Sequence, residues 1–371
     1  MNDVLGIIFS NVHDSVIGEL TAHRCMGSIP VAGRYRLIDF ALSSFVNSGI
    51  QDVGVITKSN FQSLMDHLGT GREWDLSRKR GGLVILPPYG RAETGVYRGR
   101  VEALQGIMQY IKKGSQPYVL ACDCDFVANI DYTGFIKDHM ASGADITVMY
   151  KSMDVSRLND QDLSVFAVNE RDQVCDMLIN PHVTGVQNVY MNTFIMSTSL
   201  LERVVGDCYS RNQFSFDKDV LQSGLRRMHI VGREFTGYYD RYATLQGYFA
   251  NNMSMLKAET RAELFPKESP IYTKIRDESP VRYGLDAQAH DSFIADGCII
   301  EGLVENSILF RGVTVSKGAS IRNCILMQGT AVGAGARLDY VIADKNVTVR
   351  DTRTLMGFHT YPVFISKGSV V

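Results

Sequence analysis

The sequence predicts an α/β domain with an open, mostly parallel sheet, followed by a left-handed parallel β-helix. In residues 1–262, short apolar runs alternate with helical stripes of apolar residues, the pattern of strand–helix units that build a parallel sheet. Pro266 and Pro270 bracket a short polar run, so we expect residues 263–289 to be a linker. In residues 290–371, aliphatic side chains recur every six residues among glycines, which is typical of a β-helix.

The first domain is expected to begin with a buried strand at residues 4–9, where every residue except Gly6 carries an apolar side chain. A loop over residues 10–36 then leads to a helix at 37–47, which Gly49 ends. The other expected elements are strands at 53–57, 83–86, 118–122, 145–150 and 189–196, and helices at 61–68 after an Asn60 cap, 101–111, 132–142 and 197–205.

The last part of the chain carries the six-residue step. It starts at Leu303, Leu309, Val315, Ile321 and Met327. The step then slips by one residue and continues at Val332 and Leu338. Each coil of a left-handed β-helix has three short faces, so stacked coils bury ladders of aliphatic side chains. An ordinary β-sandwich is the alternative, which this regular spacing disfavours.

Composition excludes several classes of protein. The chain has 371 residues, enough for two domains, and a formal net charge of −2, which argues against bulk binding to nucleic acid or membrane surfaces. No apolar run approaches the length of a membrane span and the start is not signal-like, so we expect a cytoplasmic protein. The seven cysteines form no CxxC pair, which argues against zinc, and we expect them to pack inside the fold.

The loop after the first strand has the position of a nucleotide site but lacks its chemistry. A loop at the carboxyl end of the first strand of an α/β sheet is a usual place for phosphates. Phosphates require glycine N–H groups and a cation. Residues 10–17 contain no glycine, Lys or Arg, and Asp14 would repel a phosphate. The loop is therefore expected to have lost a phosphate-binding role.

Several motifs identify a family. They are residues 33–40 (GRYRLIDF), 47–50 (NSGI), 74–76 (WDL), 81–82 (GG), 86–89 (LPPY), 270–273 (PIYT), 301–302 (EG), 304–307 (VENS) and 312–315 (GVTV). With these motifs nearly the whole chain resembles ADP-glucose pyrophosphorylase. The resemblance implies a Rossmann-like nucleotidyltransferase domain and a C-terminal β-helix. It also implies synthesis of ADP-glucose and pyrophosphate from ATP and glucose 1-phosphate, with Mg²⁺ held by carboxylates.

The family's substrate loop is altered in this sequence. Its glycine-rich motif, GGxG(S/T)RL, falls on residues 11–17, where none of the three glycines is kept and the arginine is replaced. The lysine of the family's KPA motif is replaced as well. The residues now at these substrate-loop positions include Asn11, His13, Asp14, Val16 and Met26.

The metal and sugar-phosphate positions are altered too. One metal aspartate is kept as Asp125, but the second falls on Arg241, whose charge would repel Mg²⁺. Asp240 is adjacent, but a one-residue shift on a strand turns a side chain to the other face. Asp125 alone is a weak metal candidate, and capping the following turn is its alternative role. The sugar-phosphate lysine falls on Asn180.

Two further family motifs are partly kept. The glucose-contacting motif SHDFGKD reads QFSFDKD at residues 213–219, so only its second half is kept. The motif YKGTA reads YRGRV at residues 97–101. The losses thus concentrate on working parts, while scaffold motifs remain.

This pattern resembles the catalytically degenerate, regulatory-type subunit known in some Gram-positive bacteria, which forms a heterotetramer with an active paralogue. We therefore expect a regulatory, catalytically disabled subunit of ADP-glucose pyrophosphorylase in glycogen biosynthesis. It would modulate the active subunit, or form a homotetramer when alone, and would require no cofactor. The alternatives are a weakly active, Mg²⁺-dependent glucose-1-phosphate adenylyltransferase and a free-standing sensor.

An anion site is also expected. In the family it lies between the two domains and uses basic residues after the altered loop. The candidates in this chain are His23, Arg24, Arg34, Arg36, Arg72, Lys345 and Arg350. These cations suit a phosphorylated effector such as AMP or a sugar phosphate. The alternatives are that Arg34 and Arg36 only pair with local acids, and that the loop holding Arg72 and Trp74 serves packing or a subunit contact.

Overall fold

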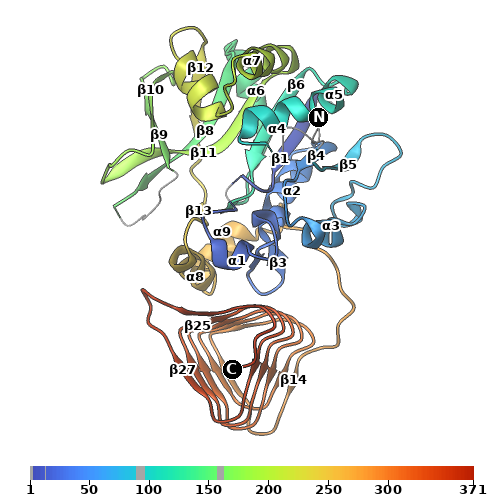
Figure 1. Cartoon of the computed structure of the whole chain (residues 1–371), viewed down its shortest axis with the longest axis vertical. Helices are drawn as coiled ribbons and strands as arrows, with labels where there is room; N and C mark the ends of the chain where they lie inside the picture. The colour runs from blue at the N-terminus through green and yellow to red at the C-terminus, as the bar shows by residue number, and fades with distance from the viewer. Residues whose placement is uncertain (1–2, 13, 89–96, 157–162) are drawn as a thin grey trace.

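The computed structural model describes residues 3–12, 14–88, 97–156 and 163–371. Figure 1 shows an α/β domain above a triangular β-helix, joined by an extended segment that runs down one side. Within the described part of the chain, no helix is both long and apolar enough to cross a membrane.

The α/β domain is built on a sheet whose main path runs β10-β9-β11-β6-β1-β4-β5, with β8 on β11 and β12 on β8. The strands are β1 (Val4–Phe9), β4 (Asp52–Ile56), β5 (Gly82–Leu86), β6 (Tyr118–Asp123), β8 (Ile146–Asp154), β9 (Ser164–Val168), β10 (Val174–Ile179), β11 (Val186–Ser197) and β12 (Ile230–Glu234). Strands β6, β1, β4 and β5 are parallel, as expected, and β12 is parallel to β8. Strand β11 is antiparallel to β6, β8 and β9, which the sequence pattern did not indicate.

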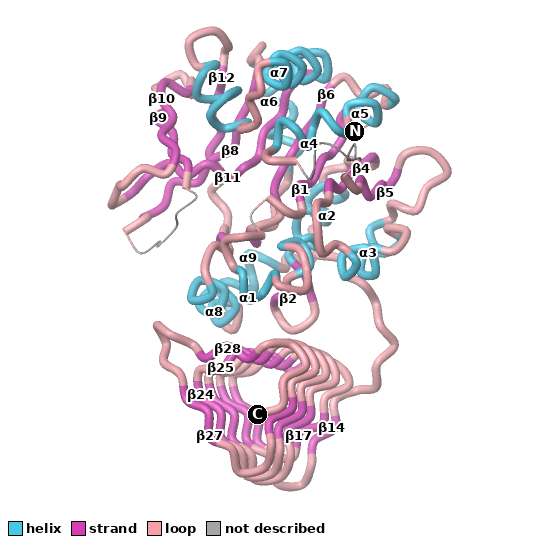
Figure 2. Tube along the Cα trace, in the orientation of Figure 1, coloured by secondary structure: helices cyan, strands magenta, loops and turns pink. Residues whose placement is uncertain are grey.

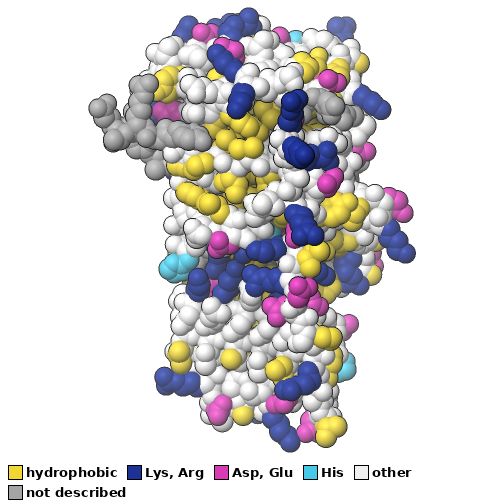
Figure 3. All heavy atoms as spheres, turned by 90° about the vertical axis from the view of Figure 1, so that its right-hand side faces the viewer, with side chains coloured by type: hydrophobic (Ala, Val, Ile, Leu, Met, Phe, Trp, Pro, Cys, Tyr) yellow, Lys and Arg dark blue, Asp and Glu magenta, His cyan; other side chains and the backbone are white. Residues whose placement is uncertain are grey.

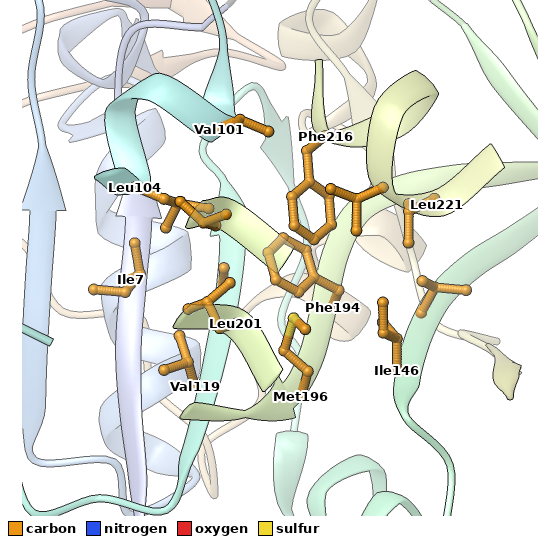
Figure 4. Packing of buried hydrophobic residues seen from close by; sticks show 14 of the residues in the cluster. Ile7, Val101, Leu104, Val119, Ile146, Phe194, Met196, Leu201, Phe216 and Leu221 are labelled. Atoms are coloured by element: carbon orange, nitrogen blue, oxygen red, sulfur yellow. The ribbon is translucent and has the colours of Figure 1, made fainter. Parts of the chain in front are cut away.

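Some of the helices cover the two faces of this sheet, and others lie between the sheet and the β-helix. The helices are α1 (Gly18–Thr21), α2 (Leu37–Asn47), α3 (Gln62–Leu68), α4 (Arg100–Gly106), α5 (Met108–Lys113), α6 (Tyr132–Ser142), α7 (Thr198–Ser210), α8 (Leu245–Ser254) and α9 (Ala258–Leu264). Ile7 and Ile8 of β1 point to opposite faces and belong to separate apolar clusters. Figure 4 shows the first cluster, where Phe194 of β11 stacks on Phe216 with ring centroids 4.2 Å apart.

Three details of the expected elements are wrong. Asn60 does not cap α3; its amide donates to the carbonyl oxygens of Thr21 and Ala22 instead, with Asn60 at a positive φ. The helix expected over 101–111 is two helices, because Ile107 leaves helical geometry between α4 and α5. Cys175 is exposed, whereas the other six cysteines are buried as expected.

The β-helix is confirmed. Its three sheets, each of five parallel strands, form the three sides of the triangular coil in Figure 2. The strands are β14 (Arg282–Tyr283), β15 (Gln288–His290), β16 (Phe293–Ile294), β17 (Ile299–Ile300), β18 (Leu303–Glu305), β19 (Ile308–Leu309), β20 (Thr314–Val315), β21 (Ser320–Arg322), β22 (Ile325–Leu326), β23 (Ala331–Val332), β24 (Arg337–Asp339), β25 (Val341–Ala343), β26 (Thr348–Val349), β27 (Thr354–Met356) and β28 (Val363–Ile365). Val304, Ile321 and Leu338 pair in register from coil to coil and form one buried ladder. Strands β14 and β15 begin within residues 263–289.

The two domains share an apolar core. Ile308, Phe310 and Met327 of the β-helix pack in one cluster with Phe40 of α2 and Tyr248 of α8. The β-helix is therefore seated on the α/β domain by continuous side-chain packing, and the residues on either side of this core lie at one junction.

Candidate functional site

The polar side chains of the altered loop form hydrogen bonds within the loop and to neighbouring backbone groups. Asn11 is buried, and its amide donates to Asp14 Oδ2 over 2.5 Å and to the carbonyl oxygen of Ser59 over 3.0 Å. Asp14 Oδ1 accepts a 2.7 Å hydrogen bond from the backbone N–H of Met26. The acceptor oxygens of Asp14 thus fix the loop geometry at a place where a phosphate would need donors. His13 lies outside the described residues.

The retained aspartate lies against an arginine. Asp125 follows β6, and short strand β13 (Asp240–Arg241) pairs antiparallel with β7 (Phe126–Val127) beside it. Arg241 Nε is 2.9 Å from Asp125 Oδ2, and both side chains are buried. Asp240 points elsewhere, as the alternation of a strand requires, and its carboxylate accepts hydrogen bonds from Tyr238 and Ser254. Burial raises the pKa of Asp240 to about 6.

A second arginine joins two more carboxylates near this point. Arg100, the first residue of α4, donates through Nε and Nη2 to both carboxylate oxygens of Asp123 at the end of β6. Its Nη1 donates to Asp217 over 3.0 Å. Burial lowers the pKa of Arg100, but the two carboxylates outweigh burial and hold its pKa well above the ordinary value. We call these two arginines and their three aspartates the vestigial site.

The vestigial site does not fit Mg²⁺. A magnesium ion needs carboxylate oxygens that are not already neutralised by cations, and it tolerates no guanidinium among its ligands. Here a guanidinium lies on Asp125, and another lies on Asp123 and Asp217. Among the residues that the structure describes, no group of three or more His, Cys, Asp or Glu could hold a metal ion. Asn180, expected near the sugar phosphate, is exposed at the end of β10.

A different set of cations meets at the domain junction. Arg24 is buried, and its Nη2 lies 2.6 and 2.8 Å from the two carboxylate oxygens of Asp344 in the β-helix. Arg36 donates to the carbonyl oxygen and the hydroxyl of Ser63 over 2.5 and 3.0 Å. Lys345 is the next residue after Asp344, so the candidates Arg24, Arg36 and Lys345 do come together.

Like charges at the junction lower one another's pKa values. Burial, followed by the positive charges of Arg36 and Arg24, lowers the pKa of Lys345 to about 7, and Lys367 acts in the same direction. Burial lowers the pKa of Arg36 to about 10, and Arg24 and Arg276 act in the same direction. Figure 3 shows Lys and Arg side chains gathered at the waist between the domains. We call this cluster of cations, which includes Arg24, Arg36, Arg276, Lys345 and Lys367, the junction site.

The junction site extends beyond the expected residues. Burial lowers the pKa of Arg311 on the β-helix, with Arg34 and Arg276 as further causes. Arg276, Arg311 and Lys367 were not among the candidates, because they lie in the linker and in separate coils. The basic residues of the linker and coils were the available signal, but the sequence did not show which coil position faces the junction.

Other candidates are not joined to the junction site. His23, Arg72 and Arg350 are exposed, and none of the three is among the leading charges that shift the pKa values of Arg36, Arg311 and Lys345. Trp74, in the same turn as Arg72, is buried and packs on the ring of His67 at 5.9 Å between centroids. The packing role of Trp74 is therefore the correct alternative. Arg36 bonds serine oxygens, and neither it nor Arg34 has an ion pair with an acid among the described residues.

Comparison with known proteins places these sites in a family. The Nucleotidyl transferase family model matches residues 17–203, and the model described as GlmU-like, C-terminal hexapeptide matches residues 279–360. The chain is 32% identical to "Glycogen biosynthesis protein GlgD" of Bacillus subtilis (strain 168) over 370 residues, covering 100% of this chain and 97% of that protein. It is 34% identical to a protein of the same name from Geobacillus stearothermophilus, covering 86% of this chain and 83% of that one.

The enzymes that carry the catalytic name are similarly related. The chain is 31% identical to "Glucose-1-phosphate adenylyltransferase" of Clostridium perfringens (strain SM101 / Type A), covering 89% of this chain and 86% of that enzyme. Identity at this level extends over both the α/β domain and the β-helix. This chain belongs to the glucose-1-phosphate adenylyltransferase, or ADP-glucose pyrophosphorylase, family of glycogen biosynthesis.

Proposed function

We propose that this chain is a regulatory, catalytically disabled subunit of ADP-glucose pyrophosphorylase that modulates an active paralogous subunit. The observation that carries the proposal is the buried contact between Arg241 and Asp125, 2.9 Å apart. It puts a fixed positive side chain where the family resemblance requires a second metal aspartate. The altered loop supports the same conclusion, because Asn11 and Asp14 bond each other and offer no cation to a triphosphate.

The partner in this proposal is the catalytic subunit, in a heterotetramer, with a homotetramer as the form adopted without it. The proposed site of regulation is the junction site, which would take the phosphate of an effector such as AMP or a sugar phosphate. The charges of Arg36 and Arg24 lower the pKa of Lys345, so an added anion beside Lys345 would relieve that repulsion. Because both domains supply cations, an anion there would act on both domains.

Pyrophosphate release from ATP and glucose 1-phosphate with Mg²⁺ tests the proposal. The reaction is run with this chain alone, with a catalytic paralogue alone, and with the two co-expressed. We expect no turnover from this chain alone and an altered rate or saturation curve for the mixture. Turnover by this chain alone, proportional to its concentration and abolished by Asp125→Ala, would establish instead a weakly active, Mg²⁺-dependent adenylyltransferase.

The effector proposal has its own test. Co-expressed subunits are assayed with and without AMP, for the native chain and for Arg36→Gln in this chain only. The substitution is expected to reduce the response to AMP without changing the basal rate of the mixture. Glu202→Gln, in an exposed ion pair between α5 and α7, is the matched control and should leave the response unchanged. An unchanged response in the Arg36→Gln mixture would exclude the junction site as the place of regulation.

A further inference from the structure

Two family-motif positions that changed in this chain contact each other in the fold. Arg100 stands where the family motif YKGTA has threonine, and Asp217 stands where SHDFGKD has glycine. They are separated by 117 residues in the sequence, yet Arg100 Nη1 lies 3.0 Å from Asp217 Oδ1. Random loss of catalytic residues would not bring a new cation and a new carboxylate into hydrogen-bonding distance.

Arg100 also contacts strand β6. Its Nε and Nη2 hold both carboxylate oxygens of Asp123, the last residue of β6. Arg100 is 8% exposed and Asp123 is 1% exposed, so water screens this contact little. The planar guanidinium group fixes the directions of its donors, so one side chain sets the relative position of α4, β6 and the π-helix η3 (Phe216–Gln222).

Further contacts join the chain around Arg100 to the chain before Asp217. Arg98 donates to Asn212 Oδ1 over 2.6 Å, and its guanidinium lies 4.7 Å from the ring centroid of Phe214. The backbone N–H of Val101 donates to the carbonyl oxygen of Phe214 over 3.2 Å. Gly99 allows this approach, because a Cβ there would lie 2.3 Å from that oxygen. We call the contact of residues 98–101 with 212–217 the seam.

The segment on the far side of the seam is itself fixed. Asp219 accepts hydrogen bonds from the backbone N–H groups of Phe214 and Ser215 over 3.0 and 2.9 Å, which holds the turn before η3. Phe216 then anchors the segment in the core by stacking on Phe194. The seam therefore joins residues 98–101 to a segment that is held by its own contacts, and the resemblance assigns that segment, residues 213–219, to contact with glucose.

We propose that the vestigial site has become an internal cross-link, in which Arg100 joins β6 to η3 and keeps the seam closed without any ligand. In this arrangement a protein guanidinium supplies the positive charge that the carboxylates of the site require. The α/β domain then holds one closed form at all times. This inference rests on the proposed loss of catalysis, because only a site that no longer has to admit a substrate can stay closed.

A double-mutant cycle on the chain alone tests the cross-link. Arg100→Thr removes the cation from two carboxylates and should lower the melting temperature by about 4–6 °C, and Asp217→Asn should lower it by about 2–4 °C. In the Arg100→Thr background, Asp217→Asn should change it by less than about 1 °C, since the partner is already gone. Glu202→Gln, in an exposed ion pair, is the control and should shift it by about 1 °C at most. Additive shifts would overturn the cross-link.

Hydrogen exchange gives an independent readout if the threonine variant does not fold. In the native chain, amides of residues 98–101 and 212–217 should be protected, and adding ATP, glucose 1-phosphate and Mg²⁺ should not change their protection. Asp217→Asn should speed exchange in both segments. Protection that develops only when the substrates are added would show that the seam closes on a ligand, and would overturn the inference. Neither readout involves a partner subunit, so either can fail while modulation of the partner is observed, and the reverse.

Discussion

Two regions of this molecule gather buried or half-buried arginine and lysine side chains, and the charges around these side chains differ. In the vestigial site each guanidinium lies on carboxylates, as Arg241 does on Asp125 and Arg100 on Asp123 and Asp217. At the junction site Arg24 also lies on a carboxylate, that of Asp344, but the largest charge effects on Lys345 come from other cations, Arg36 and Arg24. In the first region every guanidinium lies on carboxylates of the chain itself, whereas the second region has an excess of positive charge.

This difference indicates which of the two regions an added anion would stabilise. A buried cation beside a carboxylate gains nothing from an added anion, because the carboxylate already supplies the negative charge. A buried cation beside other cations is repelled until an anion arrives or a proton leaves. The junction therefore retains the electrostatic conditions for binding that the vestigial site has lost, and substitutions in the two regions should differ in sign.

Removing the arginine of the vestigial site should have the largest effect. Arg241→Met leaves Asp125 buried beside an apolar side chain, which should cost about 3–5 kcal/mol and lower the melting temperature by about 4–6 °C. Thermal unfolding followed by circular dichroism measures the shift. Arg78→Met is the matched control, because Arg78 pairs with exposed Asp75 on the surface, and it should cost less than about 1 kcal/mol. Equal shifts for the two variants would remove the distinction between the two regions.

Removing a cation from the junction should have the opposite sign. Lys345→Met is expected to raise the melting temperature by a few degrees, on the order of 1 kcal/mol, at pH 6. The lysine has a pKa of about 7 when folded and near 10.5 when unfolded, so its destabilising effect is complete below pH 7 and declines as the pH rises toward 10.5. Melting curves of both proteins at pH 6 and pH 9.5 measure this difference. A gain that grows with pH would contradict the assignment.

The affinity of the junction site for anions should depend on the protonation of Lys345. Sulfate keeps its charge across this range, so any change in its affinity between pH 6 and pH 8 belongs to the protein. We expect sulfate to bind roughly tenfold more weakly at pH 8, because Lys345 has then lost its proton. Calorimetric titration of the native chain measures this change, and Lys345→Met should show a flat profile. A steep profile in the methionine variant would assign the proton to another group.

The exposed arginines should have the smallest effect. Arg72 and Arg350 were candidates for the anion site, but both are exposed and are not joined to the junction cations. Arg72→Ala and Arg350→Ala are therefore expected to change sulfate affinity by less than about twofold, through long-range charge alone. Titrations at low and moderate salt check this expectation. A tenfold loss for either variant would enlarge the junction site.

Periodic features could be predicted from the sequence because each is fixed by local geometry. The six-residue step located the buried ladder that includes Ile321 and Leu338, since every coil repeats the same three faces. Strand alternation separated Asp240 from Arg241 for the same reason. The helix at Leu37–Asn47 has the expected bounds, because an apolar stripe and Gly49 define both ends.

Long-range pairings could not be predicted. Arg24 and Asp344 are 320 residues apart, and nothing near either residue indicates the other. Asp217 shows in the sequence only as a lost glycine, and its role depends on Arg100 in another motif. Asn60 had the composition of a helix cap, but its amide binds the α1 region instead. The partners of these side chains are set by tertiary packing, and a local sequence pattern carries no information about that packing.

The shared core and the Arg24–Asp344 pair also limit how the chain can be divided. A protease cut in the linker would leave Arg24 on one fragment and Asp344 on the other, each buried at 2% exposure in the intact protein. Separation would bring both charges and the apolar faces of Phe40 and Phe310 into water, or leave them to aggregate. A nicked chain should therefore stay associated through the junction, so cleavage of the linker alone would not separate the β-helix from the α/β domain.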